Sequence, residues 1–114
     1  MNLKRDPTEL AATLLNRSTC AVQVAAVLLD KWGVFSWGWN GSGQTGMGEH
    51  AEAHAFRRSN KRRIPYATMY VAAVRKRNGK IITAKPCEAC WKFIRQWGIT
   101  VMYRDGAGEW KLLS

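Results

Sequence analysis

The first third of the chain changes from a helical to an extended pattern of hydrophobic residues. Asp6 is followed by proline and, three residues on, by glutamate. Leucines then recur at helical spacing, so residues 7–16 are predicted to form a helix that Asp6 caps. Residues 20–29 are rich in valine and alanine, and after a turn at 30–33 the extended pattern resumes at 34–39. We therefore expect a helix followed by a hairpin with one largely buried strand.

A glycine-rich loop separates this hairpin from a second helix. Residues 40–48 include four glycines, which no regular element tolerates well. Residues 49–56 then form a good helical segment, and the basic run after them ends the helix. Residues 68–74 have the β-branched and aromatic composition of a central strand. The middle of the chain thus predicts an open loop, a helix and a buried strand.

The C-terminal third combines one helix with two short strands. Pro86 starts a helix in which Cys87 and Cys90 share one face. Residues 99–103 are predicted to form a buried strand, and residues 109–113 another after a short turn. The order helix, hairpin, helix, strand, helix, strand, strand predicts an α/β fold with a mixed sheet covered by helices.

Length and composition favour one domain over residues 1–114, either alone or in a simple homo-oligomer. Hydrophobic residues make up 46% of the chain, yet no apolar run approaches a membrane span. We therefore expect a cytoplasmic protein with no membrane partner. Eighteen lysines and arginines against eight acidic residues give a net charge of +10. This charge increases solubility and attracts anions such as nucleotides and nucleic acids.

Three residues form a candidate zinc site: His50, Cys87 and Cys90. Zinc binds thiolate sulfur and histidine nitrogen, and catalytic sites supply three protein ligands and leave the fourth position to water. The first turn of the third helix favours thiolates, because unpaired backbone N–H groups and the helix dipole stabilise negative charge. A lone Cys-x-x-Cys also occurs in redox pairs and structural half-sites, so the histidine is needed to specify an open site.

Glu52 is the candidate proton carrier beside this metal. Zinc-bound water can lose a proton near neutral pH, and an amine that leaves a nucleobase must gain one. Glu52 lies two residues after His50, which is about 200° around a regular helix. The two side chains can therefore reach one pocket only if His50 precedes the regular part of the helix, and the glycine loop permits this.

Together these motifs resemble those of a known enzyme superfamily. His-Ala-Glu at residues 50–52, followed about 35 residues later by Pro-Cys-x-x-Cys at 86–90, is the zinc-deaminase signature. Along nearly its whole length the chain resembles the cytidine and deoxycytidylate deaminase superfamily, which also contains tRNA adenosine deaminases and polynucleotide cytosine deaminases. The resemblance implies a three-layer α/β/α sandwich around a five-stranded mixed sheet. It also implies that His50, Cys87 and Cys90 bind Zn2+ and that Glu52 shuttles protons.

The resemblance extends to one segment that contacts substrate. Residues 38–40, Gly-Trp-Asn, are similar to the superfamily's Gly-aromatic-Asn segment, whose asparagine hydrogen-bonds the sugar or base. Asn40 is therefore expected to bind substrate. Trp39, at the expected mouth of the pocket, and Ala51, inside the first motif, complete the predicted substrate contacts.

Two departures from the superfamily pattern change the expected details. In many relatives the strand after the first zinc helix leads straight into the Pro-Cys motif, whereas here residues 75–85 intervene and change the pocket wall on that side. The turn at 105–108 leaves no room for the fourth helix that joins the last two strands of deoxycytidylate and tRNA-editing members. The chain is therefore more similar to the branch with an antiparallel C-terminal β-hairpin, which contains nucleoside deaminases and several toxin deaminases.

Two other functions compete with deamination. His50 and His54 are spaced as in zinc peptidases, but peptidases place glutamate directly after the first histidine, where this chain has Ala51. His54 is therefore assigned either to packing or to a position that supports the metal ligands. A non-catalytic nucleic-acid binder with a closed structural zinc would need a fourth ligand, for which Cys20 is the candidate. The position of Cys20 at the start of a buried strand favours a core cysteine instead.

Basic residues crowd the far end of the helix that starts at the zinc ligand. They are Arg57, Arg58, Lys61, Arg62 and Arg63. That helix is about three turns, or roughly 15 Å, long, so these charges cannot touch a base at the site but could hold phosphates along a strand. The small size and the C-terminal hairpin favour a small substrate. We therefore predict a zinc-dependent hydrolytic deaminase of cytosine in a nucleoside or nucleotide, with single-stranded DNA or RNA second and tRNA adenosine third.

Overall fold

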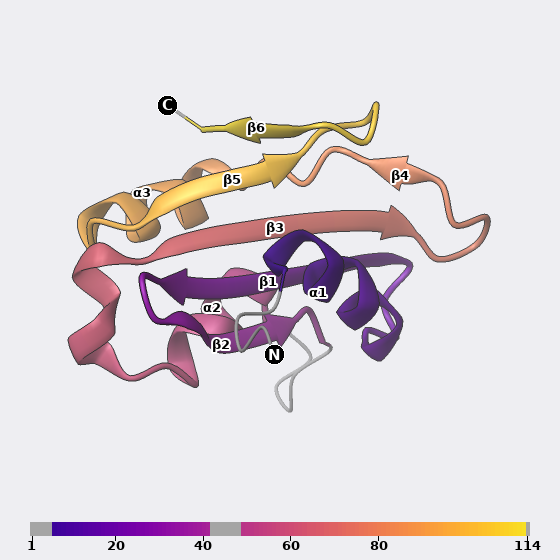
Figure 1. Cartoon of the computed structure of the whole chain (residues 1–114). Coiled ribbons are helices and arrows are strands. Elements are labelled where there is room, and N and C mark those ends of the chain that lie inside the picture. Colours follow the sequence, from indigo (N-terminus) through magenta and orange to yellow (C-terminus); the bar gives the residue numbers. More distant parts are fainter. Residues whose placement is uncertain (1–5, 42–48, 114) are drawn as a thin grey trace.

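Helices and strands follow one another in the predicted order in the computed structural model, which describes residues 6–41 and 49–113 (Figure 1). The elements are α1 (Pro7–Leu14), η1 (Leu15–Arg17), β1 (Val22–Asp30), β2 (Gly33–Trp39), α2 (Ala51–Arg57), η2 (Lys61–Tyr66), β3 (Thr68–Arg75), β4 (Ile81–Ile82), α3 (Glu88–Gln96), β5 (Thr100–Arg104) and β6 (Trp110–Leu112). Most of the predicted glycine loop at 40–48 lies outside the described residues. None of the described helices is long and apolar enough to cross a membrane.

The strands form one mixed sheet with the order β2-β1-β3-β5-β6. β3 and β5 are parallel, and the other neighbours in this order are antiparallel. A parallel pair requires a long crossover connection, and α3 lies within it. Beyond the five predicted strands, the two-residue β4 pairs with β3, so the sheet has six strands within residues 6–41 and 49–113. The segment that was expected to alter the pocket wall is therefore an extension of the sheet.

Helices cover both faces of this sheet, which confirms the predicted three-layer sandwich (Figure 1). On one face, Leu14 of α1 packs in the same core as Val27 of β1. On the other face, Ala55 of α2 and Ile94 of α3 share a core with Leu28. Neighbouring residues of a strand point to opposite faces, so Val27 and Leu28 serve different cores. Burial on both faces explains why β1 is almost continuously hydrophobic.

β5 and β6 form the predicted antiparallel C-terminal hairpin. Asp105 closes its turn, because its carboxylate accepts hydrogen bonds from the backbone N–H groups of Ala107 at 2.9 Å and Glu109 at 3.0 Å. Gly108 adopts a positive φ of 86°, which favours glycine. The chain therefore passes from β5 to β6 without an intervening helix.

A close contact between β2 and α2 sets the distance between this helix and the sheet. Gly38 is buried, and a Cβ atom built on it would lie 2.5 Å from the backbone nitrogen of Ala55. Ser36, two residues earlier on the same face of β2, donates a hydrogen bond from its hydroxyl to the carbonyl oxygen of Ala55 at 2.6 Å. A side chain at position 38 would hold α2 away from the sheet.

Gly38→Ala is expected to lower the free energy of unfolding by about 1–3 kcal/mol, because backbone atoms of α2 would have to shift. Gly41→Ala is the matched control, since a Cβ atom at Gly41 would meet nothing within 4 Å. We expect that control to stay within about 0.5 kcal/mol of the wild type. Urea unfolding of the two variants measures the difference. Equal stabilities would show that α2 does not depend on the glycine.

Candidate functional site

His50 stands at the N-cap of α2, just outside the regular helix. Its backbone is extended, with φ −71° and ψ 149°, and its carbonyl oxygen accepts the first helical hydrogen bond from the N–H of His54 at 3.0 Å. Glu52 lies one residue inside the helix. The predicted conflict of about 200° between the two side chains does not arise, because only one of them has helical geometry. The start of α2 therefore directs both side chains toward one place.

Cys87 occupies the corresponding position in α3. It is the N-cap residue, with φ −65° and ψ 164°, and the helix begins at Glu88, two residues later than Pro86. Cys90 lies in the first turn of the helix. The ligand atoms of His50, Cys87 and Cys90 all lie within 4.8 Å of one another, and His50 Nδ1 is 3.1 Å from Cys90 Sγ. Two helix N-termini thus converge on one group of metal-ligating atoms.

This group suits zinc in both donor chemistry and electrostatics. One imidazole and two thiols are the donors that Zn2+ prefers, and three protein donors make an open site. Burial, the nearby Glu52 carboxylate and Cys87 raise the pKa of the Cys90 thiol to about 12. A thiol in this environment stays protonated unless a cation stabilises the thiolate, and a bound divalent ion does so. Cys20 lies at the bend before β1 and is not part of the group.

Glu52 is a buried carboxyl group beside these donors. Its residue exposure is only 6%. Burial raises the pKa of Glu52 above its usual value, while a backbone hydrogen bond and the neighbouring His50 act in the opposite direction. Glutamate side chains are rarely buried in proteins unless they have a partner. The Glu52 carboxyl group is buried and lines a cavity.

The cavity beside Glu52 has a volume of about 200 Å3, below the roughly 300–1,000 Å3 typical of pockets for drug-sized ligands. Its size suits a single small ring. Its wall comes from β1, the end of β2, the start of α2, β3 and the segment before α3. The lining residues are Val22, Val24, Asn40, His50, Ala51, Glu52, Ala73, Thr83, Ala84, Lys85, Pro86 and Cys87.

Asn40 and Trp39, both predicted to contact substrate, lie in different surroundings: only Asn40 is at the cavity. Asn40 lines the cavity, and its side chain is tied to β1: Oδ1 accepts a hydrogen bond from Val24 N–H at 2.9 Å, and Nδ2 donates to the carbonyl oxygen of Val22 at 2.7 Å. Trp39 does not line the cavity. Its ring packs edge-on against His54, with centroids 4.8 Å apart. Adjacent residues in a strand face opposite ways, which separates Asn40 from Trp39.

His54 has the packing role predicted for it. Its Nδ1 lies 3.1 Å from the backbone nitrogen and 3.0 Å from the carbonyl oxygen of Trp39. It does not belong to the group of metal-ligating atoms around His50. The peptidase-like pair of histidines is therefore not formed.

The basic cluster predicted to contact nucleic acid is largely engaged within the protein. Arg57 makes two hydrogen bonds to the Glu49 carboxylate, at 2.9 and 3.0 Å. Lys61 donates to the carbonyl oxygens of Phe56 and Ser59 at the end of α2. The guanidinium group of Arg58 stacks over Trp37, and Arg63 pairs with Asp30. Within the described part of the chain, Arg62 alone of the five has neither an ion pair nor a stacked ring. Arg57, Arg58, Lys61 and Arg62 stay exposed, but neighbouring groups of the protein hold every member of the cluster except Arg62.

The Arg63–Asp30 pair predicts a pH-dependent contribution to stability. Two hydrogen bonds of 2.6 Å join the groups, the Asp30 side chain is only 3% exposed, and the pKa of Asp30 is lowered mainly by these bonds. Because the pKa of Asp30 is lower in the folded state than its value of about 3.9 in the unfolded state, its ionised form stabilises the protein above about pH 3.9. This stabilisation is lost as the pH falls through the pKa of the folded state. Asp30→Asn should lower the free energy of unfolding by about 1–3 kcal/mol at pH 7. Urea unfolding should show that the difference in stability between wild type and variant shrinks below about pH 3.9. A difference that does not change with pH would contradict an ionic origin of the stabilisation.

The sequence predicted that residues 75–85 change the pocket wall, but it did not identify the side chains that line the cavity there. Ala73, Thr83 and Lys85 line the cavity but belong to no motif. One signal was available: the chain has no acidic residue between Glu52 and Glu88, so every charge in that interval is positive.

The sandwich and the donor group define an α/β domain with an open, three-donor metal site. The family model for the cytidine and deoxycytidylate deaminase zinc-binding region matches residues 1–104. The chain therefore belongs to this family of zinc-dependent deaminases. Zinc is the metal of the family, in agreement with the imidazole and thiol donors.

Solved structures of cytidine deaminases share the fold. The enzyme from Burkholderia pseudomallei has a TM-score of 0.70 and 20% identity, with 95% of this chain and 89% of that chain covered. Cytidine deaminase from Mycobacterium leprae has a TM-score of 0.59 and 15% identity, with 92% and 88% covered. A mutant cytidine deaminase from Mycobacterium tuberculosis has a TM-score of 0.56 and 16% identity, with 82% and 80% covered. No protein of curated function matches the chain in sequence.

Proposed function

We propose that this protein is a zinc-dependent hydrolase that removes the exocyclic amino group from the cytosine base of a nucleoside or nucleotide. The observation that carries the proposal is the buried Glu52 carboxyl, which lines a small cavity together with His50 and Cys87. A proton carrier, metal donors and a space for one ring therefore meet at one place. Family membership supports the same reaction.

His50, Cys87 and Cys90 would hold the zinc ion. Zinc with three protein ligands supplies a nucleophile at neutral pH by lowering the pKa of a water molecule. The position of both cysteines at the start of α3 helps them to bind as thiolates, because the unpaired N–H groups of the first turn favour negative charge.

Glu52 would move the protons of the reaction. Hydrolysis of cytosine consumes one water molecule and yields uracil and ammonia. A proton from water must reach ring nitrogen N3, and another must reach the departing amine. A carboxylate beside the reacting carbon can accept each proton and return it, as a general base and then a general acid. Glu52 is the carboxyl group that lines the cavity among the described residues, and it is only 6% exposed.

Asn40 and Ala51 would position the base. The Asn40 amide keeps one N–H and one lone pair beyond its bonds to β1, so it can still make hydrogen bonds with a substrate. Its tie to β1 fixes the direction of those bonds before the substrate enters. Ala51 is fully buried and brings backbone and a small side chain to the cavity wall. Only the base needs to enter, whether its nucleotide is free or part of a strand.

A substrate panel tests the proposal directly. Zinc-loaded protein is incubated with cytidine, deoxycytidine, their monophosphates, single-stranded DNA and RNA containing one cytosine, and an RNA hairpin with one adenosine. Mass spectrometry then detects replacement of the amine by oxygen. Uracil from at least one cytosine substrate is the expected result. Product from adenosine alone would overturn the assignment of the base, and no product from any substrate would overturn the deaminase.

A further inference from the structure

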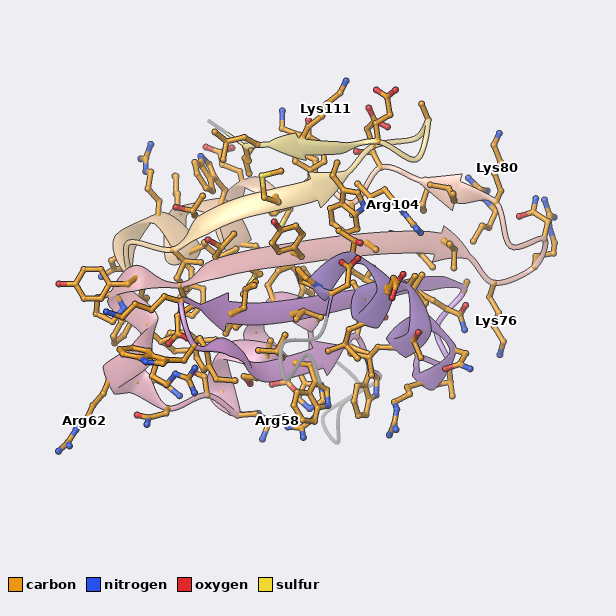
Figure 2. The ribbon with its side chains drawn as sticks, in the orientation of Figure 1. Arg58, Arg62, Lys76, Lys80, Arg104 and Lys111 are labelled. Atoms are coloured by element: carbon orange, nitrogen blue, oxygen red, sulfur yellow. The ribbon has the colours of Figure 1, made fainter. Side chains whose placement is uncertain are left out.

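Basic side chains gather on the β3–β4 hairpin at one end of the cavity. They are Arg75, Lys76, Arg77 and Lys80, all exposed. Figure 2 shows Lys76 and Lys80 projecting from the right-hand end of the view, whereas Arg62 of the predicted basic cluster projects from the left. Lys85, in the segment after this hairpin, lines the cavity itself. The positive charge nearest the cavity is therefore on this part of the chain.

This hairpin adjoins the site directly. Ala73 of β3 lines the cavity, and Arg75 lies two residues farther along the same face, about 7 Å away at 3.3 Å per residue. Val22 of β1, the register partner of Arg75, also lines the cavity. Val22, Arg75, Lys76 and Arg77 together line a second hollow beside it. Val22 is thus a shared wall, with the cavity on one side and the basic hollow on the other.

The basic side chains of the hairpin form no ion pairs among the described residues, and two of them lie close together. None of the ion pairs among the described residues involves Arg75, Lys76, Arg77 or Lys80. Arg75 N–H donates to the carbonyl oxygen of Lys80 at 2.9 Å, one step beyond the Val74–Ile81 pair, so Arg75 and Lys80 are cross-strand neighbours on one face. Like charges in this arrangement destabilise a hairpin. An anionic ligand would relieve their repulsion.

We propose that the β3–β4 hairpin binds phosphates that flank the target cytosine in a single-stranded nucleic acid. This rests on the proposed deaminase function, because it places the target base in the cavity. Lys85 is positioned for the phosphate nearest that base. Arg77 lies four residues beyond Ala73, up to roughly 13 Å of extended chain, so it suits a phosphate of a neighbouring nucleotide. A single strand leaves the base free to enter the cavity, whereas a duplex would have to be opened.

Two variants matched in charge test this assignment. Arg75→Gln/Lys80→Gln removes the cross-strand pair beside the cavity. Lys31→Gln/Arg95→Gln removes one lysine after β1 and one arginine in the last turn of α3, both exposed and free of ion pairs in the described chain. Turnover is measured on deoxycytidine, deoxycytidine monophosphate and a single strand with one cytosine. Binding of a labelled strand is measured separately over a range of salt concentrations, so it does not depend on turnover.

The hairpin variant should lose at least tenfold in kcat/KM on the strand, mainly through KM, and stay within about twofold on deoxycytidine. Its plot of log affinity against log salt should flatten by about 1.4, which is two phosphate contacts at about 0.7 each. Its melting temperature should not fall, because a repulsion has been removed. The control variant should keep the wild-type slope and strand turnover.

Three results would overturn the proposal. The first is an equal loss of strand binding and strand turnover in the hairpin and control variants, which would show that net charge alone is responsible. The second is a loss of turnover confined to deoxycytidine monophosphate, which would assign the hairpin to binding a free nucleotide. The third is deoxycytidine turnover without strand binding at low salt. Strand binding that depends on the hairpin, without deamination of any substrate, would instead contradict the proposed function.

Discussion

Glu52→Gln is expected to lower kcat by about 10²–10⁴-fold on every substrate that the wild type deaminates, while zinc occupancy and fold are retained. Glutamine has the shape of glutamate but cannot take up and return a proton. Because Glu52 is not among the three donor residues, zinc should stay at about one ion per chain.

Glu88→Gln is the matched control for this variant. Glu88 also lies in the first turn of a helix that starts at a metal donor, but its side chain is 83% exposed and paired with Lys92. Its replacement should leave kcat within about twofold, since exposed pairs of this kind contribute little. Elemental analysis, circular dichroism and single-turnover assays are compared for both variants. Activity of Glu52→Gln close to the wild type would remove the carboxyl from the reaction.

Cys87→Ser is expected to abolish both zinc binding and the stability that zinc confers. The wild type should hold about one zinc per chain, and a protein held at a zinc concentration of 100 times Kd gains about 2.7 kcal/mol. Cys87 is exposed, so the loss of its sulfur costs little packing. The variant should therefore unfold like wild-type protein treated with a chelator, and chelator should have no further effect on it.

Cys20→Ser serves as the control, because Cys20 is only partly buried and lies outside the donor group. It should keep full zinc occupancy and respond to chelator as the wild type does. Occupancy is measured by elemental analysis, and stability by urea unfolding with and without chelator. Full zinc occupancy in Cys87→Ser would show that this thiol is not a ligand.

Local sequence signals predicted most elements of the fold. Asp6 accepts a hydrogen bond from Thr8 N–H at 2.9 Å and caps α1 as predicted, and the turn at 105–108 joins the last two strands as predicted. Such signals act within a few residues, so the sequence carries them completely. The missed strand, β4, is only two residues long, and its existence depends on β3 beside it.

The sequence by itself also predicted the candidate chemistry of the site. His50, Cys87 and Cys90 are of residue types that can bind zinc, and Glu52 is of a type that can carry a proton. The expectation that His50 must precede the regular helix followed from the helical period alone. The extended backbone of His50 confirms it.

Only the tertiary structure decided which charges and polar groups are available. Arg57 and Arg63 stand in a basic run, but Arg57 pairs with Glu49 before the same helix, and Arg63 pairs with Asp30, 33 residues away along the chain. Among the described residues Arg75 and Lys80 form no ion pair, and Arg75 lines the hollow beside the cavity. The energy of a charge depends on its neighbours within a few ångströms, and in a folded chain those neighbours come from other strands and helices. Residue type and spacing therefore determine what a side chain can do, whereas packing determines which side chains remain free to do it.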